Sequence, residues 1–216
     1  APGATAMHLI GEFNNWDRTS HPMKAVGDGN WEIMIPGVRT LRHRSKVKVA
    51  VTSARGTEDR IPLYATYVVQ DEKTHNFSAA IWNPRKEFEW TDGKFRPKKN
   101  VPPLIYEAHV GMATEEERVG TYLEFMRDIL PRIKKDGYNT VQLMAVMEHP
   151  YYASFGYQVS NFFAASSWYG TPDDLKALIN EAHAMGLSVL LDLVHSHAVK
   201  NTAEGINMFD GTTWQF

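Results

Sequence analysis

The chain has 216 residues, of which 43% are hydrophobic and 22% charged, a composition typical of a globular protein with a real core. Its formal net charge of −2 gives no attraction for nucleic acids or anionic membranes. The absence of cysteine excludes disulfides, thiol catalysis and cysteine-ligated metals, and it fits a reducing compartment, so we expect a cytoplasmic protein. No apolar run approaches the roughly 20 residues of a bilayer span, and no signal peptide is visible.

Short runs with apolar alternation or many β-branched residues predict four strands in the first hundred residues, at 7–13, 31–35, 46–52 and 65–70. Turn-forming residues separate these runs. Strands at this spacing predict a small antiparallel β-sandwich over residues 1–98. The basic, Pro- and Gly-containing stretch 91–103 then leads into a second region, and we place the linker proper at 99–103.

Residues 104–216 alternate between apolar runs and helical spacing. Apolar runs at 104–109, 140–146 and 188–194 predict buried strands, and 122–135 has helical spacing that Pro131 should kink or divide. Between the last two runs, Thr171 can cap a helix, Pro172 fits its first position, and Gly186 can end it in a left-handed conformation. Strands alternating with helices in this way predict parallel βαβ units.

Three strands are too few for a complete parallel sheet, because the strand at 188–194 would leave an open edge. The chain also begins with Ala1 and ends without a terminal helix. We therefore expect residues 104–216 to form only the first part, about three βα units, of a longer domain, and we expect the chain to be cut at both ends.

Acidic residues and histidines recur at the predicted strand ends, where functional residues of parallel α/β proteins gather. The groups are Glu107 with His109, Glu148 with His149, and Asp192 with His195 and His197. One interpretation is a metal site in which His195 and His197 share a strand face, although no carboxylate stands at a usual ligand spacing. A second is a structural role in satisfying loop backbones. We favour a third, a site for a polyhydroxylated substrate.

Aromatic residues make up 12% of the chain and include six Trp, several of them beside Gly, Asn or Asp. Aromatic planes can stack on the C–H faces of sugar rings, while Asn, Asp and Lys bind sugar hydroxyls. The composition is therefore compatible with carbohydrate binding, although a place in the core remains the simpler explanation of any single Trp.

The residues 192–197, DLVHSH, resemble the first signature motif of the α-amylase superfamily of glycoside hydrolases, Asp-x-x-x-x-His at the end of the third barrel strand. The runs YEAHVG at 106–111, MEHPYYASFGYQ at 147–158, NFFAASS at 161–167 and YGTP at 169–172 resemble the glycogen and starch branching enzymes in particular. The resemblance covers essentially the whole chain. It implies an immunoglobulin-like β-sandwich carbohydrate-binding module followed by the first part of a TIM (β/α)8 barrel.

The resemblance also implies substrate-binding residues. The run LIGEFNNWD at 9–17 is similar to the hallmark of the carbohydrate-binding module, with Trp16 as the glucan-stacking tryptophan and Lys48 as the lysine paired with it. The alternative for Trp16 is that it plugs one end of the sandwich. In the barrel, Tyr157 would stack on the sugar at the cleavage subsite, Asp192 would hold neighbouring polar groups, and His197 would donate to a sugar hydroxyl.

Retaining glycoside chemistry needs two carboxylates about 5–5.5 Å apart. In the family, the nucleophilic Asp, the acid/base Glu and a further Asp come from later strands, and none of their motifs follows His197. The resemblance thus implies that the whole protein cleaves an α-1,4 glucan (glycogen, amylose or starch) and transfers the piece to a 6-hydroxyl, forming an α-1,6 branch. It implies no catalytic residue in the present chain, which we expect to be inactive, and no metal or cofactor.

Two alternatives remain open. An isoamylase-type debranching enzyme would share the front module and the 192–197 motif but should differ around 151–158. A non-catalytic glucan-binding protein would use the sandwich alone. Nothing in the sequence specifically supports a third alternative, a purely structural interaction protein.

Overall fold

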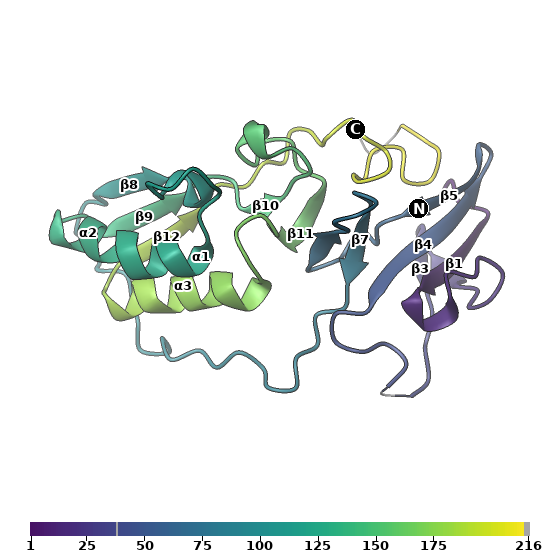
Figure 1. Ribbon diagram of the computed structural model, residues 1–216, viewed down its shortest axis with the longest axis horizontal. Helices are drawn as coiled ribbons and strands as arrows, with labels where there is room; N and C mark the ends of the chain where they lie inside the picture. The colour runs from purple at the N-terminus through teal and green to yellow at the C-terminus, as the bar shows by residue number, and fades with distance from the viewer. Residues whose placement is uncertain (38, 214–216) are drawn as a thin grey trace.

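The computed structural model describes residues 1–37 and 39–213. An antiparallel sheet region formed by the first eighty residues and a parallel sheet region lie at opposite ends of an elongated molecule (Figure 1). This arrangement confirms the predicted order of a β-sandwich followed by part of an α/β barrel.

The antiparallel region is built around one long central strand. This strand, β4, pairs with β1 on one side and β7 on the other, β6 continues the sheet beyond β7, and β5 returns along β4. The bounds are β1 Ala6–Gly11, β4 Lys46–Ser53, β5 Gly56–Arg60, β6 Val68–Gln70 and β7 Phe77–Ala80. Alternate β4 side chains, Val47, Val49 and Val51, face the core, as the period of a strand requires. A hairpin of β2 (Lys24–Gly27) and β3 (Asn30–Glu32) packs Trp31 against that core.

Several strand boundaries differ from the prediction. The first strand ends at Gly11 instead of residue 13, because the Asn14 side chain accepts a hydrogen bond from Gly11 N and closes the short 3-10 helix η1 (Glu12–Asn14). The strands β2, β5 and β7 were not predicted. They are short, and β5, with the sequence GTEDR, has no apolar alternation, so only its pairing with β4 makes it a strand.

The parallel sheet has the order β12–β9–β8, with β9 in the centre. The bounds are β8 Ile105–Ala108, β9 Thr140–Leu143 and β12 Ser188–Leu191. The helices α1 (Tyr122–Glu124), η3 (Phe125–Ile129), α2 (Leu130–Lys135) and α3 (Pro172–Ala184) cover one face of it (Figure 1). A further 3-10 turn, η2 (Val110–Met112), follows β8.

Local signals explain how these helices begin and end. Thr171 caps α3 by accepting from Asp174 N, and Gly186 takes φ 76° just beyond its end, both as predicted. Proline has no N–H to donate, and the chain accommodates Pro131 with a π-helical turn in which Leu130 N donates to Phe125 O. The predicted helix at 122–135 is therefore divided.

An antiparallel ladder joins the two regions. It consists of β10 (Met147–Glu148) and β11 (Asn161–Ala165), and the 3-10 turn η4 (Tyr152–Ser154) lies between them. Ala164 of β11 belongs to the same buried cluster as Val47 and Val68 of the sandwich. The stretch between the second apolar run and the helix α3 thus contains the element that joins the barrel part to the sandwich.

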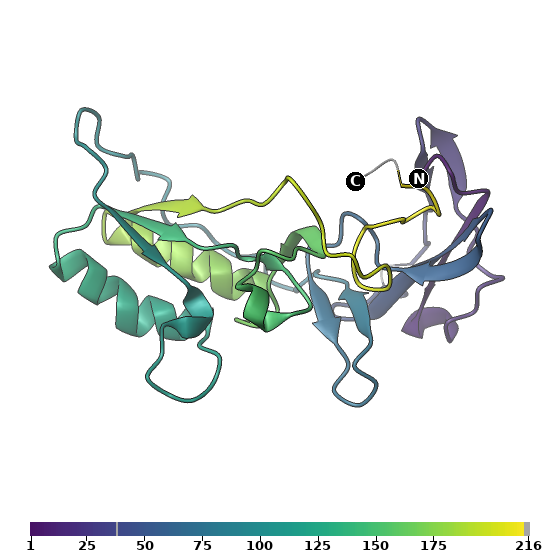
Figure 2. The same cartoon turned by 90° about the horizontal axis from the view of Figure 1, so that it is seen from above.

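The segment 199–211, here called the strap, runs from the end of the parallel sheet back over the sandwich (Figures 1 and 2). Near its start, Val199 N donates to Val159 O at 2.8 Å. Near its end, Phe209 is buried in the core with Met7 and Val49. The strap is therefore a second connection between the two regions.

Candidate functional site

Three residues predicted to bind substrate lie together at the carboxyl end of β12. The hydroxyl of Tyr157 donates to Oδ2 of Asp192 at 2.7 Å, and Nε2 of His197 donates to the Tyr157 carbonyl at 2.7 Å. Ser196 Oγ lies 3.0 Å from His197 Nδ1. Two separate loops, one before β11 and one after β12, thus form a single hydrogen-bonded group.

The fold places these side chains through backbone constraints. Asp192 N donates to Leu143 O at 3.0 Å, which extends the ladder between β12 and β9 by one residue and holds Asp192 at the strand tip. Gly156 has φ 89°, and a Cβ there would collide with the carbonyl oxygen of Ala145. Only glycine fits this approach, so it directs the chain that carries Tyr157.

Electrostatics maintain the link between the two loops. The hydrogen bond to the Asp192 carboxylate raises the pKa of Tyr157 to about 12 and keeps its hydroxyl protonated. Oδ1 of Asp192 makes no hydrogen bond within 1–37 and 39–213, so it remains an acceptor for a ligand. His197, in contrast, uses Nε2 on a carbonyl. His197 could donate a hydrogen bond from Nε2 to a sugar hydroxyl only if its hydrogen bond to the Tyr157 carbonyl broke.

The metal interpretation assumed that His195 and His197 lie on one strand, and the structure shows that they do not. The strand stops at Leu191, three residues before the predicted end, so His195 and His197 lie in a loop and do not share a strand face. Among the residues that the structure describes, no group of three or more His, Cys, Asp or Glu side chains could hold a metal ion.

Of the acid–histidine groups at the other two strand ends, only Glu107 comes near this site, where its negative charge helps Asp192 to raise the pKa of Tyr157. Glu107 is exposed and accepts a hydrogen bond from Gln142. His109 is buried and its Nε2 lies 3.1 Å from the Tyr169 hydroxyl. Burial lowers the pKa of His109 and keeps it neutral. His109 thus contributes to the packing of the barrel part.

Glu148 is completely buried, which the sequence did not indicate. Its carboxyl accepts from Ser167 N at 2.7 Å and from His149 N at 3.2 Å, and no cation pairs with it among the described residues. Burial raises the pKa of Glu148 to about 8 and lowers that of His149, so both side chains are held largely uncharged at neutral pH.

Trp16 lies on a turn that displays it to solvent. Asn15 and Trp16 both have left-handed backbones, with φ 53° and 61°, and 38% of Trp16 is exposed. A bulky residue at positive φ is uncommon and needs support, which Trp16 N provides by donating to Gly11 O at 2.9 Å. The exposure argues against Trp16 as a plug for the sandwich.

Lys48 is half-buried on β4, opposite Ile10 of β1. Burial lowers its pKa, while the nearby carboxylates of Asp59 and Glu204 act in the opposite direction. No hydrogen bond or ion pair links Lys48 to Trp16 in the described part of the chain. The predicted pairing of these two side chains therefore stays a prediction.

Comparison with known proteins reveals two families in succession along the chain. Residues 1–65 match carbohydrate-binding module 48 (isoamylase N-terminal domain), and residues 111–211 match the alpha amylase catalytic domain. A 1,4-alpha-glucan-branching enzyme of Aspergillus oryzae is 54% identical over 217 residues, which cover 98% of this chain and 32% of the relative. One of Rhizophagus irregularis, with the same coverage, is 53% identical. The chain is homologous to the branching enzymes of the α-amylase superfamily.

This relationship covers only part of the relatives: the chain spans about a third of the length of the fungal branching enzymes. The branching enzyme 2-2 of Arabidopsis thaliana, named chloroplastic/amyloplastic, is 49% identical over 98% of the chain and 27% of the relative. Among solved structures, a putative alpha amylase from Salmonella typhimurium has a TM-score of 0.72 at 23% identity, covering 96% of this chain and 32% of its own, and supports the fold alone. No described helix is long and apolar enough to cross a membrane.

Proposed function

We propose that the chain is the glucan-binding front part of a branching enzyme that cleaves an α-1,4 glucan and transfers the piece to a 6-hydroxyl. The main support is the Tyr157–Asp192–His197 group, which presents an aromatic ring and a carboxylate acceptor at one strand tip. Sugar rings have apolar faces for the ring and hydroxyls for the carboxylate. Trp16 adds a separate exposed aromatic surface on the sandwich.

In this proposal the chain binds glycogen, amylose or starch but does not catalyse transfer, because the sequence motifs that carry the catalytic carboxylates in this family do not occur after His197. The catalytic carboxylates belong to the remaining two thirds of the whole protein. A cytoplasmic location, the boundaries 1–98, 99–103 and 104–216, and the absence of a cofactor requirement are parts of the same proposal.

Glycogen co-sedimentation of the chain tests the sandwich surface. Trp16→Ala should weaken binding severalfold or more, because stacking on an exposed ring is lost. Trp90→Ala is a matched control, since Trp90 is also exposed, at 47%, and lies outside the sandwich strands. Equal binding by Trp16→Ala and the parent chain would exclude Trp16 as the stacking surface.

The whole protein tests the barrel site and the reaction. Iodine absorbance of amylose should fall without release of reducing ends, because transfer, unlike hydrolysis, leaves their number unchanged. Tyr157→Ala should reduce that rate far more than Tyr157→Phe, which retains the ring and loses only the hydroxyl. A rise in reducing ends from amylose would instead indicate hydrolysis of α-1,4 bonds. A rise from glycogen alone, whose α-1,6 branches a debranching enzyme can cut, would support the debranching alternative that the names of the relatives disfavour.

A further inference from the structure

A groove of about 850 Å³ lies at the amino ends of the three parallel strands, at the opposite end of the sheet from Tyr157 and Asp192. Leu104, Thr140 and Ser188, at or next to the strand starts, line it, and the segment 94–103 forms its outer wall. In Figure 2 the chain before β8 rises as a loop beside the sheet. The groove has the size of a small-molecule site.

The charged side chains that line the groove are all positive among the described residues. Lys94, Arg96 and Lys98 line the wall formed by the segment, and Lys134 of α2 lines another side. No Asp or Glu is among the described lining residues, and none of the four cations forms an ion pair within 1–37 and 39–213. Since the whole chain carries a net charge of −2, this concentration of positive charge is local.

The wall is held in place at both ends. At its start, Thr91 N donates to the Asn180 side chain, His183 bonds Asp92 at 2.7 Å, and Phe95 stacks on His183 with ring centroids 4.1 Å apart. At its end, the Asn139 amide donates to the Pro102 carbonyl and accepts from Leu104 N. The backbone that carries the cations is therefore organised in advance, which lowers the entropy cost of binding.

Phe95 and Tyr138 provide aromatic surface in the same groove, with apolar Val101 and Leu104 beside them. A ligand that matches this lining has a compact anionic group for the lysines and a ring for the aromatic surface. We propose that the groove binds a small organic phosphate of the sugar phosphate class. The site is independent of the proposed glucan-binding residues, so either proposal can fail without the other.

Calorimetric titration of the 216-residue chain with glucose 6-phosphate, at about 50 mM ionic strength, tests the proposal. We expect saturable binding of glucose 6-phosphate, weaker binding of inorganic phosphate, which has no ring, and none of glucose, which has no charge. The double variant Lys98→Gln/Lys134→Gln should bind roughly tenfold more weakly, because two favourable charge contacts disappear. Neither lysine side chain makes a hydrogen bond with another residue that the structure describes, so the fold should persist.

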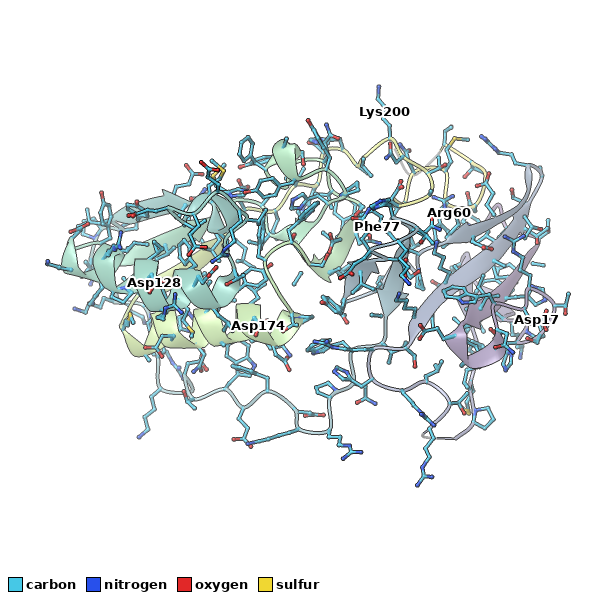
Figure 3. The ribbon with its side chains drawn as sticks, in the orientation of Figure 1. Asp17, Arg60, Phe77, Asp128, Asp174 and Lys200 are labelled. Carbon is cyan, nitrogen blue, oxygen red and sulfur yellow. The ribbon has the colours of Figure 1, made fainter. Side chains whose placement is uncertain are left out.

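The matched control is Lys24→Gln/Lys200→Gln, which removes the same charge far from the groove. Lys24 lies on the sandwich hairpin, and Lys200 projects from the edge of the molecule opposite the linker (Figure 3). This variant should bind glucose 6-phosphate as the parent does. No saturable binding, or equal losses in the two double variants, would overturn the proposal. So would phosphate binding as tight as that of glucose 6-phosphate, or tighter binding of a short polyglutamate peptide.

Discussion

At the scale of single residues, the most unusual group is the Glu148 carboxyl, which is 0% exposed and has no cationic partner among the described residues. Because burial disfavours the charged form, the pKa of Glu148 rises from 4.5 to about 8. The folded chain then holds a proton that the unfolded chain releases above about pH 4.5. Its stabilising contribution is complete below that pH and is lost as the pH rises through about 8.

This linkage predicts the behaviour of Glu148→Gln in urea unfolding. The parent should lose more stability than the variant between pH 5 and pH 8, by up to about 1.4 kcal/mol per pH unit. The pKa values of His109 and His149 are lowered, which has the opposite pH dependence, but both proteins share it. Glu107→Gln, at an exposed carboxyl, should show no such difference. A difference between parent and Glu148→Gln that is the same at both pH values would refute the assignment.

At the scale of elements, Arg60 on β5 holds the strap against the sandwich (Figure 3). Only 1% of Arg60 is exposed, and its guanidinium donates to the carbonyls of Gly205, Asn207 and Met208 at 2.7 to 2.9 Å. It also lies over the Phe209 ring. Burying a charge is favourable only when hydrogen bonds compensate it. Here the strap backbone supplies three of them, and Nε of Arg60 alone has no hydrogen-bond partner among the described residues.

Arg60→Met should therefore lower the free energy of unfolding by about 2–4 kcal/mol, because three strap carbonyls lose their charged donor. Amide exchange of residues 205–209 should accelerate. The control is Arg18→Met, which breaks the exposed pair with Asp59 and should cost less than about 1 kcal/mol. Similar costs for the two variants would show that Arg60 does not hold the strap.

At the scale of the whole molecule, the two proposed binding surfaces lie far apart. The exposed ring of Trp16 lies on the sandwich, whereas the cationic groove lies at the far end of the parallel sheet. Stacking on a neutral glucan involves no charge, while attraction of a phosphate is screened by salt. The two binding properties should therefore respond differently to ionic strength.

Raising the salt concentration from about 50 mM to about 500 mM should leave glycogen co-sedimentation within a factor of about two and weaken glucose 6-phosphate binding at least fivefold. Both measurements use the same chain, so a general loss of folding would affect them together. Equal sensitivity of the two ligands to salt would show that they share one electrostatic site.

The sequence by itself determined the features that rest on local chemistry. Thr171 predicted the start of α3, Gly186 predicted its end, and Pro131 predicted that the helix at 122–135 is divided. These predictions were possible because capping and dihedral preferences act over a few residues. The three apolar runs predicted the parallel sheet. They were also expected to be buried, but only the central strand β9 is, because β8 and the end of β12 are exposed. The family motifs also named Tyr157, Asp192 and His197, whose roles in glucan binding remain predictions.

Only the tertiary structure decided which of these parts meet. The polar strand β5 exists because β4 pairs with it, and Glu148 is a buried acid because β11 and its neighbours cover it. Arg60 and the strap lie about 145 residues apart in sequence. The groove likewise combines a linker with three strand starts. Burial and long-range contact depend on how distant segments pack, and no local preference of the chain encodes that packing on its own.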